Sequence, residues 1–302
     1  MAPRSKSNAK NGRKPTSANP MTRRLLISAG GASLLANQAA AQTSGSSKLR
    51  LSLACWNYDR TRPLMDGRVP VDGVDLTYLT LPVEETFFRM LRHHEFDAAE
   101  LSLSSYVLSL SSPNPPFVAI PVFPSRFFRH SCMYVGVKSG IREPKDESGE
   151  LDTFQTARAP SSFTNGSGKV RRLFENYPSV EHDYYQKTKI FPIMHTVVIR
   201  RDVYAKYPWV LQSLYKAFVL AQREVYRELH ETAALHYMLP WLLPHVEETE
   251  KLMGRDFWPY GLEPNMNTLT TFLRYSREQG LSKRELAPRD LFAPESLESF
   301  KI

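Results

Sequence analysis

The stretch from Leu49 to Leu79 constrains the fold most strongly, because two strand patterns flank a dense polar segment. Leucines alternate with polar residues over 49–53, which predicts a strand with one buried face. A second strand is predicted at 74–79, directly after the turn residues Asp72-Gly73. The pattern favours an open α/β sheet, in which ligands bind beyond the carboxyl ends of the strands.

The polar segment after the first of these strands contains both arginines and aromatic side chains. Arg60 and Arg62 can each bind a carboxylate through two parallel hydrogen bonds. Trp56 and Tyr58 can face an aromatic ring. The segment therefore predicts a site for an aromatic carboxylate, and the alternative is an arginine-rich surface turn with two packing aromatics.

The first 41 residues are predicted to be an export signal rather than part of the fold. Their basic start is followed by Arg23-Arg24 within TRRLLIS, by an apolar run, and by Ala39-Ala40-Ala41 as a cleavage site. This is a twin-arginine pattern, which predicts export to the periplasm. An uncleaved N-terminal anchor is the alternative, although the apolar run is short for a bilayer span of ~20 residues. A cytoplasmic location is the alternative to export.

The net charge of +8 comes from this leader. Residues 1–41 hold seven Lys or Arg and no Asp or Glu, and the remainder has 32 basic against 31 acidic residues. We therefore expect no nucleic-acid partner, since such a partner needs a basic patch on the folded domain. We also expect no transmembrane span after the leader.

The two cysteines, Cys55 and Cys132, are too widely spaced to form a metal motif. We expect them to pack as small apolar side chains, and a disulfide in an oxidising compartment is the alternative. No His/Asp cluster has metal-ligand spacing, so no metal site is predicted.

Regular elements are predicted along most of the remaining chain. A helix over 82–94 has Phe87, Phe88 and Leu91 as its apolar stripe, and a long helix runs from Asp202 to about Leu239 with a break. Other helices are predicted at 170–177, 244–253 and 265–279, and strands at 96–101, 117–123, 131–137 and 191–200. The polar stretch 140–151 is predicted to be a loop.

Polar residues also follow these later strands. Ser104 and Ser105 come after the 96–101 strand, where free backbone N–H groups can bind an anion, with simple helix capping as the alternative. Arg126 follows the 117–123 strand, and Arg158 lies in TARAP. His195 stands alone among apolar residues of a strand, where a hydrogen-bonded core histidine is the alternative to a catalytic one.

Several longer motifs resemble the 4,5-dihydroxyphthalate decarboxylase family, and together they cover nearly all of the chain from Lys48 onward. They are LACWNYDRTRPL in the region 51–64, LPVEETFFRML at 81–91, FDAAELSLSSYVLS at 96–109, FVAIPVFPSRFFRHS at 117–131, TARAPSSF at 156–163, FPIMHTVVIRRDVY at 191–204 and FWPYGLEPN at 257–265.

The resemblance implies an α/β, type II periplasmic-binding-protein-like fold with two lobes and a ligand cleft between them. In the family, a large block follows the motif GIREPKD, whereas here 145–146 run almost directly into 149–152. We therefore expect a truncated second lobe. The expected organisation is an export signal at 1–41, the first lobe at 42–137, a remnant of the second lobe at 138–190, and a return segment with C-terminal helices at 191–302.

The resemblance further implies decarboxylation of 4,5-dihydroxyphthalate to protocatechuate and CO2. No organic cofactor is expected, because the phenol oxygens of the substrate can delocalise the developing charge. His195 is the first choice for the proton donor, with Asp59 or Glu100 as alternatives. Substrate-binding roles are predicted for Trp56, Tyr58, Arg60, Arg62, Ser104, Ser105, Arg126 and Arg158.

Two other functions fit the same residues. One is a periplasmic solute-binding protein that delivers an aromatic or other carboxylate to the permease of an ABC importer. The export signal favours this function, because an enzyme of aromatic degradation is more naturally cytoplasmic. The same arginines and aromatics would serve binding alone. The other is an inactive homologue with an internal deletion.

Overall fold

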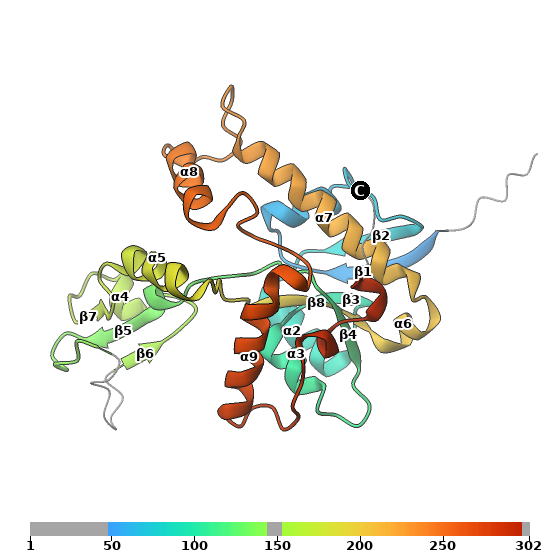
Figure 1. The fold of residues 1–302 in the computed structure, drawn as a ribbon, viewed down its shortest axis with the longest axis horizontal. Helices are drawn as coiled ribbons and strands as arrows, with labels where there is room; N and C mark the ends of the chain where they lie inside the picture. The colour runs from blue at the N-terminus through green and yellow to red at the C-terminus, as the bar shows by residue number, and fades with distance from the viewer. Residues whose placement is uncertain (1–47, 144–152, 298–302) are drawn as a thin grey trace, which may run out of the picture. The chain divides into compact units, whose positions relative to one another are not determined.

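The larger of two sheets has five strands in the order β2-β1-β3-β8-β4 (Figure 1). The structure is a computed structural model that describes residues 48–143 and 153–297, so the predicted export signal and residues 144–152 of the predicted polar loop lie outside it. The strands are β1 (Leu49–Ala54), β2 (Val74–Leu79), β3 (Ala98–Ser102), β4 (Phe117–Ile120) and β8 (His195–Arg200).

The order of these strands confirms the predicted α/β class. β1 pairs in parallel with β2 and β3, whereas β8 lies antiparallel between β3 and β4. The chain thus leaves the sheet after β4 at Ile120 and returns at His195 to insert β8 between β3 and β4. Because β8 runs antiparallel, its first residue lies at the carboxyl edge of β3, where His195 is paired with Ser102.

Helices follow most of these strands, and their ends carry local signals. α2 begins after Pro82, has two acidic residues in its first turn, and stops at His94 in the left-handed conformation. The helices beside the larger sheet are α1 (Arg62–Met65), α2 (Val83–His93), α3 (Leu103–Ser109), α6 (Arg201–Lys206), α7 (Trp209–Leu229) and α9 (Met266–Glu278). α8 (Leu242–Met253) contacts α7 and lies away from the sheet (Figure 1). Short 3-10 turns are η1 (Asp59–Thr61), η2 (His130–Cys132), η4 (Glu263–Asn265), η5 (Pro288–Leu291) and η6 (Pro294–Ser296).

One hydrophobic core joins the larger sheet to its helices. Leu53 of β1, Val198 of β8 and Phe218 of α7 are completely buried within it. Each such side chain contributes about 1.5–3 kcal/mol relative to an exposed one. This core fixes the carboxyl ends of β1 and β3, from which the site residues extend.

The smaller sheet is antiparallel, in the order β6-β5-β7. Its strands are β5 (Met133–Gly136), β6 (Thr153–Gln155) and β7 (Val170–Arg172), with α4 (Ser161–Thr164) and α5 (Tyr177–Thr188) alongside them in sequence. Within the described ranges, its core consists of Val135, Ile141 and Leu173, with Met133 and Phe174 packed against it. Truncation of this second lobe stays a prediction.

Two predictions, for residues 170–177 and for the buried face of α2, were wrong, as was a third, for the end of the helix predicted from Asp202. Residues 170–172 form a strand rather than a helix, because they pair with β5, and the helix begins only at Tyr177. The stripe predicted for α2 was misplaced: Thr86 and Met90 are buried, whereas Phe88 and Leu91 are exposed.

The helix predicted from Asp202 with a break is two helices, α6 and α7, but its predicted end was wrong. Pro208, which has no backbone N–H, lies between them, and α7 ends at Leu229 rather than near residue 239. Both cysteines are buried free thiols. Among the described residues, no helix is both long and apolar enough to cross a membrane.

Candidate functional site

Glu100, in the middle of β3, is the centre of a buried hydrogen-bond cluster. Its Oε1 accepts from the Tyr58 hydroxyl at 2.6 Å and lies 2.5 Å from His195 Nδ1. Its Oε2 accepts from the Trp56 backbone N–H at 3.1 Å and lies 3.6 Å from the Cys55 sulfur. The carboxylate is fully buried, yet every one of its neighbours here can donate a hydrogen bond.

Sheet geometry brings these residues together. β1 and β3 are parallel neighbours, so Cys55 and the residues after it continue past the edge beside Glu100. His195 reaches Glu100 from the other side of β3 as its diagonal cross-strand neighbour, since Glu100 pairs with Val197. Residues from the segment after β1 and from β8 thus converge on one carboxylate of β3.

The cluster favours an ionised Glu100. Burial alone raises the pKa of this carboxyl, but hydrogen bonds from His195, Tyr58 and the Trp56 amide, with the charge of His195, outweigh burial and hold the pKa below its ordinary value. Burial, together with the charge of Glu100, raises the pKa values of the Tyr58 hydroxyl and the Cys55 thiol. Both groups therefore stay protonated and act as donors.

His195 presents its second ring nitrogen away from Glu100. Within the part of the chain that the structure describes, Nε2 has no hydrogen-bond partner, and the side chain is 16% exposed. The Phe87 ring packs edge-on against the imidazole, with 4.9 Å between ring centroids. Glu100 holds Nδ1, so Nε2 is the nitrogen that can exchange a proton with a bound molecule.

Arg60 is held rigidly next to this cluster. Its guanidinium lies between the Tyr58 and Trp258 rings, 4.3 and 4.2 Å from their centroids. Nε donates to the Pro124 carbonyl at 2.7 Å, and Nη1 donates to Asp59 at 2.8 Å. Arg60 thus covers one face of the Tyr58 ring and donates to the Asp59 carboxylate, and the stacking of Tyr58 on a substrate ring stays a prediction.

The other residues from the same segments are more exposed. Trp56 is 41% exposed, and Arg62 is exposed and donates to Asn57 at 3.3 Å. Ser104 and Ser105 lie half-buried in the first turn of α3, beyond the carboxyl end of β3. There the backbone N–H of Ser105 is capped by the Ser102 hydroxyl at 3.4 Å.

Arg126 and Arg158 have opposite environments. Arg126 is buried, and it donates to the carbonyls of Phe191 and Pro259 and to the Asn265 side chain. Burial lowers its pKa to about 10. Arg158 is largely exposed and forms an ion pair with Glu84 at 2.8 Å. The carboxylate-binding roles of both arginines stay predictions. In Arg126, both terminal nitrogens donate to the protein itself, whereas the buried Nε has no hydrogen-bond partner among the described residues.

The sequence did not single out Glu84, Phe87 or Trp258 as site residues. Glu84 and Phe87 lie one turn apart at the start of α2, and Trp258 comes from the segment before η4. Only the motifs LPVEETFFRML and FWPYGLEPN, which carry these residues, could have indicated them. Among the described residues, no group of three or more His, Cys, Asp or Glu is placed to hold a metal ion.

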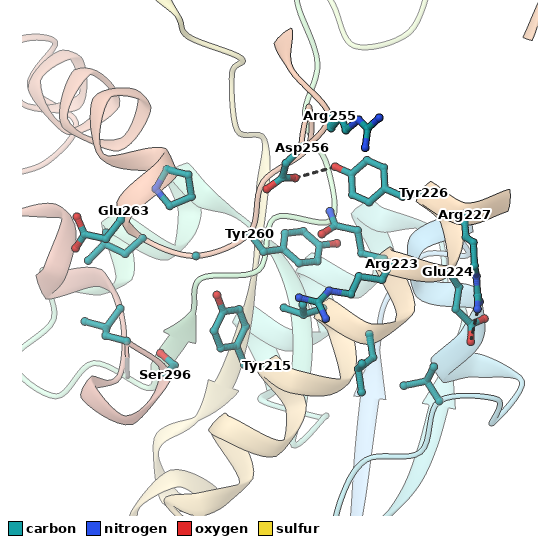
Figure 2. A pocket seen from close by; sticks show the side chains of 18 of the residues that line it. Tyr215, Arg223, Glu224, Tyr226, Arg227, Arg255, Asp256, Tyr260, Glu263 and Ser296 are labelled. Atoms are coloured by element: carbon teal, nitrogen blue, oxygen red, sulfur yellow. Dashed lines mark hydrogen bonds and ion pairs between the residues drawn. The ribbon is translucent and has the colours of Figure 1, made fainter. Parts of the chain in front are cut away.

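Two cavities lie outside the Glu100 cluster. One of about 1230 Å³ lies along α7, and none of the predicted site residues line it. Figure 2 shows Tyr226 hydrogen-bonded to Asp256 there, with Tyr260 and two arginines, Arg223 and Arg255, nearby. The other, of about 330 Å³, is lined by aromatic residues that include Trp258.

The comparison with curated proteins decides the family. A 4,5-dihydroxyphthalate decarboxylase from Comamonas testosteroni is 34% identical over 329 aligned positions, which cover 85% of this chain and all of that protein. The chain belongs to the 4,5-dihydroxyphthalate decarboxylase family. A second family protein, from Pseudomonas putida, is 48% identical over 103 residues, which are 34% of this chain and 40% of that protein. No protein-family profile matches the chain.

The first alignment is longer than the 302 residues of the chain, so the Comamonas decarboxylase has residues without a counterpart here. Solved structures with a similar fold include two sulfonate-binding proteins. The one from Methylobacillus flagellatus KT has 13% identity and a TM-score of 0.46, over 83% of this chain and 93% of that one. The one from Escherichia coli has 12% identity and a TM-score of 0.44, over 82% and 98%. What those proteins bind is not assigned to this chain.

Proposed function

We propose that this chain decarboxylates 4,5-dihydroxyphthalate to protocatechuate and CO2 without an organic cofactor. Membership of the decarboxylase family supports the reaction class. The observation that carries the proposal is the contact between the buried Glu100 carboxylate and His195 Nδ1, which leaves Nε2 available for proton transfer.

The reaction requires one proton and the loss of one carbon. Nε2 of a protonated His195 donates its proton to the ring carbon that carries the leaving carboxylate, and a C–H bond forms. The bond from this carbon to the carboxylate then breaks, its electron pair returns to the ring, and CO2 leaves. The phenol oxygens delocalise charge during the step, and His195 regains a proton from solvent.

Glu100 acts through His195 in this scheme. Its carboxylate accepts from Nδ1, which fixes the orientation of the ring and stabilises the imidazolium before proton transfer. The Tyr58 hydroxyl and the Trp56 amide hold the carboxylate in place. General acid catalysis of this kind contributes typically 10²–10⁴-fold to a rate.

The substrate carboxylates require cationic partners. Two of the predicted arginines, Arg60 and Arg158, form side-chain ion pairs, and Arg158 is the more exposed of the two. Its partner, Glu84, is also exposed. Arg60 is instead stacked on the Tyr58 ring, so it contacts the Glu100 cluster through Tyr58. We propose Arg158 as the arginine that binds a substrate carboxylate.

The site of action follows from the leader. We propose that residues 1–41 direct export through the twin-arginine route, so that the reaction takes place in the periplasm.

The test compares His195→Gln with His245→Gln in the full chain. His245 is exposed on α8 and serves as the matched control. Each protein is incubated with 4,5-dihydroxyphthalate, and protocatechuate and CO2 are quantified. We expect His195→Gln to lose at least about 100-fold of the rate while still binding phthalate, and His245→Gln to match the wild type.

Three results would count against the proposal. Equal rates for His195→Gln and the wild type would remove His195 from proton transfer. Tight binding of 4,5-dihydroxyphthalate with no product from the wild type would favour a solute-binding protein for an ABC importer. A protein that neither binds nor reacts would favour an inactive homologue.

A further inference from the structure

An ion pair connects the first turn of α2 to the segment after β6. Arg158 Nη1 lies 2.8 Å from Glu84 Oε1, and the two side chains are 77% and 58% exposed. Glu84 belongs to α2, which lies beside the larger sheet, whereas Arg158 follows β6 of the smaller sheet. The contact therefore joins residues more than 70 positions apart in the sequence.

This pair lies close to His195. A hydrogen bond from Arg158 lowers the pKa of the Glu84 carboxyl, and the charge of His195 lowers it further. Phe87, one turn after Glu84, packs edge-on against the His195 imidazole. The start of α2 thus places an aromatic ring against the histidine, and the charge of the histidine acts on a carboxylate one turn earlier.

The ion pair is easily exchanged for another one. Exposed pairs contribute only about 0–1 kcal/mol, since water and salt screen both charges. Among the described residues, Arg158 forms a single side-chain ion pair, through one of its nitrogens, although a guanidinium can bind a carboxylate through two. A ligand carboxylate that forms two hydrogen bonds can replace Glu84 with a net gain.

We propose that Glu84 is a built-in competitor that occupies Arg158 in the free protein and is displaced by a carboxylate of the substrate. Glu84 thereby sets the affinity for carboxylate ligands and selects those that can replace it. This inference rests on the proposed function, because it takes Arg158 as the substrate-binding arginine.

The competing role for Glu84 is positioning. If Glu84 only held Arg158 in a productive orientation, its removal would weaken ligand binding. A competitor predicts the opposite sign, since its removal leaves Arg158 free for the ligand. The two roles are therefore separated by the direction of a single change in affinity.

The experiment measures phthalate binding to the full chain by isothermal titration calorimetry. Phthalate carries both carboxylates and lacks the hydroxyls that support decarboxylation. We expect Glu84→Gln to bind phthalate about 2–5-fold more tightly, the equivalent of at most about 1 kcal/mol. Arg158→Gln is expected to bind at least about 10-fold more weakly.

Glu85→Gln is the matched control. Glu85 is the next residue of the same helix and pairs with Arg89 at 2.8 Å, so its removal leaves Arg158 untouched. Its affinity is expected to stay within about twofold of the wild type. The gain from Glu84→Gln is also expected to shrink in about 1 M NaCl, where the Debye length is only about 3 Å.

The outcomes separate this inference from the proposed function. Weaker or unchanged phthalate binding by Glu84→Gln overturns the competitor role, and if 4,5-dihydroxyphthalate is still decarboxylated, the proposed function stands. Binding by Glu84→Gln where the wild type shows none supports the competitor role. An absence of binding in every variant overturns it, and product assays then decide the proposed function by themselves.

Discussion

The substitution Glu100→Gln tests the buried cluster most severely. It keeps the size and shape of the side chain but replaces one acceptor oxygen with an NH₂ donor. The carboxylate faces donors on both oxygens: Tyr58 and His195 on one, and Trp56 N–H on the other. An amide can satisfy only one of these sides, so at least one buried donor loses its acceptor.

The loss of stability expected for Glu100→Gln follows from the number of buried donors that lose their acceptor. An unpaired buried donor costs about 1–3 kcal/mol, and the lost bonds are charge-assisted. We therefore expect Glu100→Gln to lower the free energy of unfolding by about 2–4 kcal/mol at neutral pH. For a domain of this size, that corresponds to a fall in Tm of about 5–15 °C.

The effect must depend on pH with a definite sign. The pKa of Glu100 is lower in the folded protein than its ordinary value of about 4.3, so the ionised carboxylate stabilises the fold. That contribution is present above about pH 4.3 and is lost as the pH falls through the folded-state value. The stability gap between wild type and Glu100→Gln should therefore narrow at low pH.

Urea unfolding at about pH 7 and about pH 3.5 measures this gap directly. Glu95→Gln is the control, because Glu95 is exposed and pairs with Arg89. Its stability is expected to stay within about 0.5 kcal/mol of the wild type at neutral pH. A gap for Glu100→Gln that is absent at pH 7, or that is the same at both pH values, would refute the argument.

Further predictions concern the rest of the cluster and the leader. Tyr58→Phe removes a 2.6 Å hydrogen bond to Glu100 and should lower the free energy of unfolding by about 1–2 kcal/mol, measured by urea unfolding, while lowering kcat more than it changes KM. An unchanged kcat would remove Tyr58 from the support of His195. Replacing Arg23 and Arg24 together by Lys should abolish export, measured by cell fractionation with the periplasmic fraction assayed for the chain. Continued export of that variant would contradict the twin-arginine route.

Much of the larger sheet could be predicted from the sequence, because its strands carry local signals. The alternation over 49–53 and the turn at Asp72-Gly73 predicted β1 and β2, and the structure confirms both. β7 could not be predicted, because its spacing of apolar residues also fits a helix. Pairing with β5, which is distant in sequence, decided the outcome.

The pairing of Glu100 with His195 was beyond sequence reasoning for a topological reason. Both residues were candidates individually, but their contact depends on β8 inserting beside β3 from 95 positions away. The sequence suggested that Tyr58 stacks on a substrate ring, but it did not indicate that the Tyr58 hydroxyl donates to Glu100 or that Arg60 covers the ring. The residue types were visible in the sequence, whereas their partners were set by the register of the sheet.

The environment of Arg126 also depends on residues that are distant in sequence. An arginine after a strand and among aromatics suggested a carboxylate ligand. The acceptors that it contacts are the carbonyls of Phe191 and Pro259 and the Asn265 side chain, which come from segments far along the chain. No local pattern indicates that such an arginine is buried.

The most direct test of the central claim is the reaction of the full chain with 4,5-dihydroxyphthalate in D₂O, with the product analysed by mass spectrometry and NMR. We expect protocatechuate with one deuterium at the ring carbon that lost its carboxylate, one CO2 per product, and loss of the deuterated product with His195→Gln. Bound but unchanged 4,5-dihydroxyphthalate after prolonged incubation with the wild-type chain would contradict the claim.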